Sequence, residues 1–172
     1  MPPLILTLEL DEKTFQFFDD KRKIYFPKER NFLAAHLTLF HHLPAGEQTV
    51  RDEIELAAHQ QPVFALSVAG MMFTGNGVAY KLESERLRDM HKGMQHSWQQ
   101  WLIRQDKQTL RPHVTVQNKV SSERAKQLYE QLSESFVPFE ASGTGLGLWE
   151  YLGGPWKLLA NFPFGAIKQP AV

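Results

Sequence analysis

The segment RPHVTVQ, residues 111–117, carries a histidine and a threonine two positions apart within a short apolar run. The segment AHLTLFH, residues 35–41, repeats this order in the first half of the chain. Alternation of apolar and polar residues predicts a β-strand, in which side chains two positions apart point to the same face. The polar faces would carry His36, Thr38 and Phe40 in the first strand and His113, Thr115 and Gln117 in the second.

Two such strands facing each other across a groove would bring together two imidazoles and two hydroxyls. An in-line displacement at phosphorus needs a base on the attacking oxygen and an acid on the leaving oxygen. Histidine, with an unperturbed pKa of about 6.5, can serve as either. The hydroxyls can donate to the non-bridging oxygens. The alternative for each motif alone is structural, since threonine favours strands and a histidine often ends one.

The rest of the chain predicts an α+β architecture with two similar lobes in one domain over residues 1–172. Strands are expected at 4–10, in two or three segments of 62–83, and twice after residue 135. Helices are expected at 49–59, at 84–102 and from Ser121. The charged segment 19–30 is predicted to be a solvated connection between two elements. Gly143, Gly145 and Gly147 mark a bend or a close backbone approach rather than a nucleotide fingerprint.

Composition restricts the class of protein and ligand. The chain has 172 residues, 42% of them apolar, which suits one compact domain. Nineteen basic and nineteen acidic residues balance, so we expect a small or end-recognised ligand rather than long nucleic acid. The absence of cysteine excludes disulfides and thiolate metal sites. We expect a cytoplasmic monomer without a membrane span or a basic leader.

The segments HLTLF (36–40) and RPHVTVQ (111–117) resemble the paired H-x-T-x signatures of the 2H phosphoesterase superfamily, in particular its 2′-5′ RNA ligase-like proteins. The resemblance covers nearly the whole chain. It implies a bilobal, pseudo-two-fold fold with antiparallel sheets lining a central cleft and helices outside. It also implies action on 2′,3′-cyclic phosphates or 2′,5′-linked nucleotides and RNA ends, with ligation as the reverse reaction. His36 and His113 would be the catalytic pair, Thr38 and Thr115 would bind phosphate, and no cofactor would be needed.

The FHHLP segment (40–44) departs from the phenylalanine-leucine-glycine run of close relatives, which leaves the substrate open. The alternatives are a binding module that senses a nucleotide or RNA end without turnover, and a hydrolase of cyclic phosphates outside RNA metabolism.

Other residues carry weaker signals. Arg111, Tyr25 and Trp149 are candidate substrate contacts. A solvated loop explains Arg111 equally well, and packing is the more common role of aromatic residues such as Tyr25 and Trp149. His41 and His42 raise the possibility of a metal site, but strand geometry would separate the rings of His36 and His42 by about 20 Å. We therefore expect no metal. His59, His91 and His96 lie on expected helices and are assigned to the surface or the edge of the core.

Overall fold

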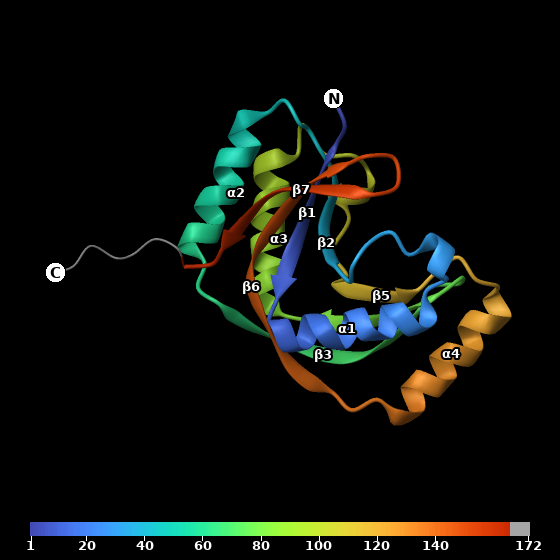
Figure 1. Ribbon diagram of the computed structural model, residues 1–172. Coiled ribbons are helices and arrows are strands. Elements are labelled where there is room, and N and C mark those ends of the chain that lie inside the picture. The colour runs from blue at the N-terminus through green and yellow to red at the C-terminus, as the bar shows by residue number, and fades with distance from the viewer. Residues whose placement is uncertain (166–172) are drawn as a thin grey trace.

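The computed structural model describes residues 1–165 and shows an α+β architecture (Figure 1). The expected domain spans residues 1–172, and its residues 166–172 lie outside the described residues. The strands are β1 (Leu4–Leu10), β2 (Leu37–Leu43), β3 (Phe64–Phe73), β4 (Val78–Glu83), β5 (His113–Gln117), β6 (Phe139–Tyr151) and β7 (Trp156–Pro163). The α-helices are α1 (Glu12–Tyr25), α2 (Gln48–Gln60), α3 (Glu85–Trp98) and α4 (Ser122–Ser135), and short 3-10 helices are η1 (Lys28–Arg30) and η2 (Gln105–Lys107).

These seven strands form one antiparallel sheet with the order β2-β1-β6-β3-β4-β5, and β7 pairs with β6. The long strand β6 joins two halves, because its first residues pair with β3 and its later residues pair with β1 and β7. Strands β2 and β5 lie at opposite ends of this order and nevertheless contact each other (Figure 1). The sheet therefore bends until the two strands that carry the H-x-T segments face one another.

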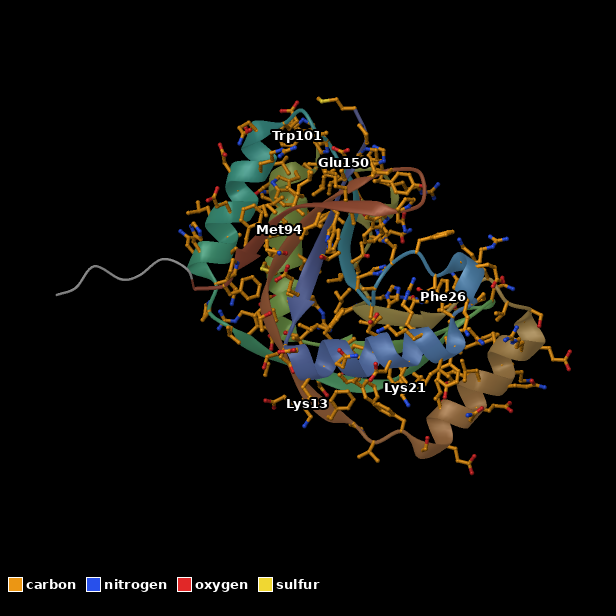
Figure 2. All side chains as sticks on the ribbon, viewed as in Figure 1. Lys13, Lys21, Phe26, Met94, Trp101 and Glu150 are labelled. Atoms are coloured by element: carbon orange, nitrogen blue, oxygen red, sulfur yellow. The ribbon has the colours of Figure 1, made fainter. Side chains whose placement is uncertain are left out.

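The helices cover the two halves in pairs. In Figure 1, α2 and α3 lie side by side at one half, and α1 and α4 lie at the other. Trp98 of α3 packs edge-on against Phe40 of β2 at 5.1 Å between ring centroids, whereas α4 contacts β3 and β4, and α1 contacts β5. Met94 on α3 is buried, and Lys13 on α1 is exposed (Figure 2). Each helix thus has one apolar face on the sheet. Among residues 1–165, no helix is long and apolar enough to cross a bilayer.

Most expected elements are confirmed, but the expectation of a solvated connection at 19–30 is wrong for residues 19–25, which belong to a helix. Helix α1 starts at the N-cap Asp11, whose carboxylate accepts from Thr14 N at 3.1 Å, and continues to Tyr25. Two of its charged side chains, Asp19 and Arg22, are buried. Their charges made the segment resemble a loop in the sequence, and only their partners in distant segments explain why they can be buried.

A β-bulge in β2 overturns the expectation that Phe40 shares a face with Thr38. Thr7 of β1 pairs with Thr38, but the preceding Leu6 pairs with Phe40, so Leu39 is an extra residue. Paired residues point to the same face, and Leu6 and Thr7 point to opposite faces. Phe40 therefore turns into the core, where it is fully buried.

Strand β5 has the equivalent bulge. Ala79 pairs with Thr115 and Val78 pairs with Gln117, which leaves Val116 as the extra residue. Gln117 is 3% exposed and its Oε1 has no hydrogen-bond partner within residues 1–165, so the expectation that it lies beside His113 and Thr115 is also wrong. Both errors have one cause, since strict alternation fails wherever pairing inserts a residue.

Candidate active site

The two motif histidines are oriented by the same local contact. His36 immediately precedes β2, and its Nδ1 lies 2.8 Å from the carbonyl oxygen of Ala34. His113 begins β5, and its Nδ1 lies 2.7 Å from the carbonyl oxygen of Arg111. A carbonyl oxygen only accepts hydrogen bonds, so each Nδ1 carries a proton. In each neutral ring the lone pair is therefore on Nε2.

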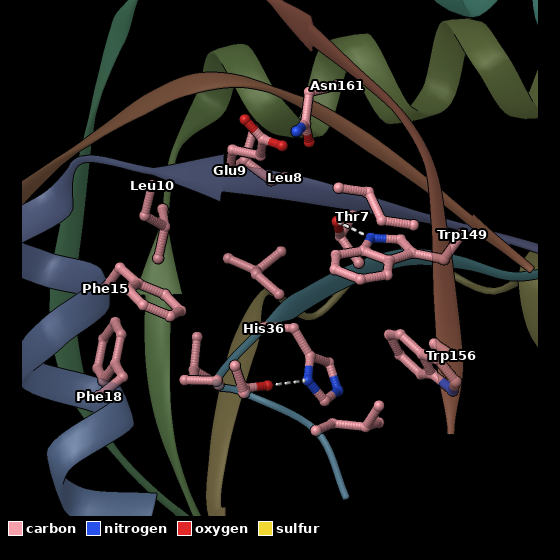
Figure 3. A pocket seen from close by; sticks show the side chains of 16 residues that line it. Thr7, Leu8, Glu9, Leu10, Phe15, Phe18, His36, Trp149, Trp156 and Asn161 are labelled. Carbon is pink, nitrogen blue, oxygen red and sulfur yellow. Dashed lines mark hydrogen bonds between the residues drawn. The ribbon is translucent and has the colours of Figure 1, made fainter. Parts of the chain in front are cut away.

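The surroundings of His36 favour its neutral form. Its ring packs against Trp156 with the ring centroids 4.6 Å apart (Figure 3). Burial lowers the pKa of His36 to about 4, against the opposing effect of its backbone hydrogen bond. The positive charge of Arg22 and the nearby imidazoles of His113 and His41 lower this pKa further. His113 is thus among the groups that act on His36 electrostatically, in line with the contact between β2 and β5.

The motif threonines follow the histidines on the half-buried face of each strand. Thr38 is in register with Thr7, and Thr115 is in register with Ala79. Both threonines are partly exposed, whereas Val114 between His113 and Thr115 is fully buried. Hydroxyls in this position can donate to an anion held between the strands.

Two residues of α1, Asp19 and Arg22, connect the motifs, and the alternation of the motif strands gives no sign of them. Arg22 Nε donates to Asn31 Oδ1 at 2.8 Å and to the Leu33 carbonyl at 2.9 Å, while Nη1 donates to the Thr115 carbonyl at 2.9 Å. Asp19 Oδ1, one turn earlier, accepts from Ala35 N at 2.9 Å.

Burial lowers the pKa of Arg22 to about 10, so the guanidinium remains charged at neutral pH. Arg22 therefore links the segment that precedes the first motif, at Asn31 and Leu33, to the backbone of the second motif, at Thr115. The available sequence signal was the i, i+3 spacing of Asp19 and Arg22 on an amphipathic helix.

An apolar cavity of about 370 Å³ lies beside His36 (Figure 3). Trp149 Nε1 donates to Thr7 Oγ1 at 2.9 Å, and the Trp149 and Trp156 rings lie 6.1 Å apart. A Cβ at Gly147 would lie 2.8 Å from Thr7 Oγ1. The expected close backbone approach is found at Gly145, where a Cβ would lie 2.8 Å from the Phe162 carbonyl oxygen. Aromatic walls with a few polar groups are typical of sites that hold a planar ring. The lining includes Thr7, Glu9, Phe15, His36, Trp149 and Trp156.

A second, polar cavity of about 570 Å³ borders the motifs. It is lined by both Thr38 and His113, so it opens directly onto the paired motifs. Arg111 lines this cavity and Trp149 lines the apolar one, whereas Tyr25, at the end of α1, lines neither.

His91 differs from its expected place at the surface or core edge, because it is 2% exposed within α3. Its Nε2 donates to the carbonyl of Leu39, the bulge residue, at 2.9 Å. Within residues 1–165, no group of three or more histidine, cysteine, aspartate or glutamate side chains is placed to hold a metal ion.

Comparisons with known proteins agree with this geometry. A family model described as the 2′-5′ RNA ligase superfamily matches residues 10–155. The fold is similar to TT0787 of Thermus thermophilus, with 16% identity, 95% of this chain and 98% of that chain covered, and a TM-score of 0.68. It is also similar to E. coli LigT complexed with 3′-AMP, with 18% identity, 95% and 98% covered, and a TM-score of 0.59. No curated protein matches the sequence.

Proposed function

Since the chain belongs to the 2′-5′ RNA ligase superfamily of phosphoesterases, we propose that it hydrolyses 2′,3′-cyclic phosphates or 2′,5′ linkages at the ends of nucleotides or RNA. One observation carries this proposal. His36 and His113 are oriented identically by backbone carbonyls, and their free Nε2 atoms belong to segments brought face to face by the sheet. Opposed imidazoles suit an in-line displacement at phosphorus, since one can remove a proton while the other donates one.

In the proposed reaction His36 is the base and His113 is the acid. Burial keeps His36 neutral, so its Nε2 accepts the proton of the attacking water as the new oxygen–phosphorus bond forms. His113, in its protonated form, donates Nε2–H to the leaving ribose oxygen as the old phosphorus–oxygen bond breaks. The products are a phosphomonoester and a free hydroxyl. In 2′,5′ ligation a 5′ hydroxyl takes the place of water and attacks a 2′,3′-cyclic phosphate, so that the new oxygen–phosphorus bond forms as the bond to the 3′ oxygen breaks and that oxygen leaves as a free hydroxyl.

Thr38 and Thr115 are proposed to donate their hydroxyls to the non-bridging phosphate oxygens, where negative charge is held during the displacement. Arg22 is a positioning residue in this scheme, because it contacts the backbone beside both motifs without lining either cavity. No step passes through a metal ion.

The apolar cavity beside His36 is proposed to hold the nucleobase, with Trp149 and Trp156 as stacking partners. LigT, which has the same fold, has been solved with 3′-AMP and with ATP. A formal net charge of zero gives no support to binding along a long RNA, so we favour mononucleotides and short ends as substrates.

The experiment is incubation with a panel of 2′,3′-cyclic nucleotides and 2′,5′-linked dinucleotides, followed by chromatographic identification of the products. Turnover with one class and not the other identifies the linkage. Tight binding of the same compounds without any product would instead support the nucleotide-binding module. Turnover only of cyclic phosphates that carry no base would support a hydrolase outside RNA metabolism.

A further inference from the structure

The bulge in β2 places His41, rather than Phe40, next to Thr38 on the face of the strand that borders the polar cavity. Because Leu39 is the extra residue, Phe40 points into the core with Leu6, and His41 returns to the face of Thr38. His41 is exposed and lines the polar cavity together with Thr38 and His113. It also acts electrostatically on His36, which lies five residues earlier on the same segment.

The bulge is stabilised by His91 of α3. The Leu39 carbonyl accepts from His91 Nε2 at 2.9 Å, and the His91 ring stacks on Phe40 at 4.5 Å and 17°. Burial lowers the pKa of His91, so the ring is neutral and needs no counter-charge. A hydrogen bond and a stacked ring thus fix the backbone from which His41 projects.

Asp106, which lies in η2 and is 3% exposed, orients the His41 ring. Its Oδ1 lies 3.0 Å from His41 Nδ1, and its two oxygens also accept from the backbone N–H of His41 and of His42 at 2.9 to 3.0 Å. Although burial acts in the opposite direction, these bonds lower the pKa of Asp106. The carboxylate is therefore ionised, His41 Nδ1 must donate to it, and Nε2 remains free for another partner.

The segment that carries Asp106 is itself held in place. Gln95 Nε2 of α3 donates to the Asp106 carbonyl at 2.9 Å and to the Gln108 carbonyl at 2.7 Å. Among the described residues that line the polar cavity, Asp106 is the only acidic one, and its carboxylate is occupied by N–H donors. The side chains left to meet a ligand there include the guanidinium of Arg111 and the hydroxyl of Thr109, which are donors, and the imidazole of His41, whose Nε2 donates when the ring is protonated. Such a cavity fits an anion.

We propose that His41, oriented by Asp106, and Arg111 bind a second phosphate of the substrate beside the one that reacts between His36 and His113. This inference rests on the proposed function and narrows its substrate class. The preferred substrate is a nucleotide end that carries, besides its 2′,3′-cyclic phosphate, a phosphate on the 5′ oxygen. That phosphate is either a terminal monoester or the linkage to a preceding nucleotide, and both present anionic oxygens to the same donors.

The test compares three substrates of the wild-type protein: adenosine 2′,3′-cyclic phosphate, its 5′-phosphorylated form, and the dinucleotide ApA with a 2′,3′-cyclic end. The second phosphate should lower KM by about tenfold, the effect of one good charge-assisted hydrogen bond. A gain with the monoester alone identifies a terminal phosphate, and an equal gain with the dinucleotide identifies the internucleotide linkage.

The discriminating variant is His41→Asn. The asparagine amide can replace Nδ1–H and keep the bond to Asp106, but it removes Nε2 from the cavity. The KM ratio between one-phosphate and two-phosphate substrates should fall to about one. The matched control is His42→Asn, because His42 is exposed and adjacent but does not line the cavity, and it should keep the wild-type ratio. Melting temperatures of both variants would show that the fold is retained.

Equal KM values for all substrates, or an unchanged ratio in His41→Asn, would overturn the second phosphate site while leaving the proposed reaction intact. Absence of turnover with every substrate would overturn the reaction. In that case calorimetry with 3′-AMP and adenosine 3′,5′-bisphosphate still decides the site, since the second phosphate should tighten binding in wild type and not in His41→Asn.

Discussion

The H-x-T segment at β2 and the one at β5 form the two half-sites of the candidate active site. In both, a histidine Nδ1 donates to the carbonyl oxygen two residues earlier, at 2.8 Å for His36 and 2.7 Å for His113. Each motif threonine is followed by a one-residue bulge, at Leu39 in β2 and at Val116 in β5. The surroundings differ. His36 packs against the Trp156 ring beside an apolar cavity, whereas His113 lines a polar cavity.

Two histidines on nearly equivalent backbones can therefore differ in protonation, and so serve one as acid and the other as base, because their surroundings differ. The local contact sets the same tautomer in both rings, but only the environment decides which ring stays neutral. Burial lowers the pKa of His36 to about 4, and for this reason we propose His36 as the base.

The largest effect is expected from removing either imidazole. His36→Ala and His113→Ala should each lower kcat/KM by about 10² to 10⁴-fold, the usual contribution of a positioned acid or base. The two variants separate on a substrate with a p-nitrophenolate leaving group, which needs no acid. His113→Ala should recover most of its loss on this substrate, whereas His36→Ala should not. Recovery by His36→Ala instead would reverse the assignment, and activity of both within a few-fold of wild type would exclude the mechanism.

Thr38→Val and Thr115→Val test whether the hydroxyls in the two half-sites act equally. The change is nearly isosteric and valine suits a strand, so both variants should fold. Each should lower kcat by about 10²-fold, as expected for a lost donor to developing charge. Circular dichroism checks the fold and steady-state kinetics measures the loss. Full activity in both variants would mean that the threonines are structural only.

Arg22→Leu disturbs both half-sites at once, because Arg22 bonds to the backbone before the first motif and to Thr115 in the second. The free energy of unfolding should fall by about 2 kcal/mol or more, since buried hydrogen bonds to a charged group are lost. We expect kcat to fall by about tenfold as the imidazoles lose alignment. Lys23→Leu is the control, because Lys23 is an exposed cation on the same helix that pairs with Asp19. Equal effects in the two variants would show that only helix charge matters.

The smallest effect is a shift in the pH profile. His36 must be neutral to act, so the acid limb of kcat/KM should lie nearer pH 4 than pH 6.5. Because the folded-state pKa is depressed, the stability that neutral His36 contributes is complete above about pH 6.5 and declines as the pH falls toward 4. Trp156→Ala should expose the ring and move the acid limb upward, while Trp101→Ala, which leaves this cavity unchanged, should not. An acid limb near pH 6.5 in wild type would contradict the neutral base.

The sequence by itself determined the positions of both H-x-T strands and the order of helices and strands after residue 35. These inferences succeed because periodicity, capping and turn residues are local properties of the chain. The strand expected at 4–10 matches β1, and the helix expected from Ser121 matches α4 with Ser121 as its N-cap.

Only the tertiary structure decided which side chains join these residues. Pairing with β1 inserts Leu39 as a bulge, which buries Phe40 and brings His41 to the cleft. Burial of Arg22 depends on acceptors as far away as Thr115. These features depend on partners distant in sequence, whose register and distance no local pattern encodes, and they set the pKa of His36 and the linings of both cavities.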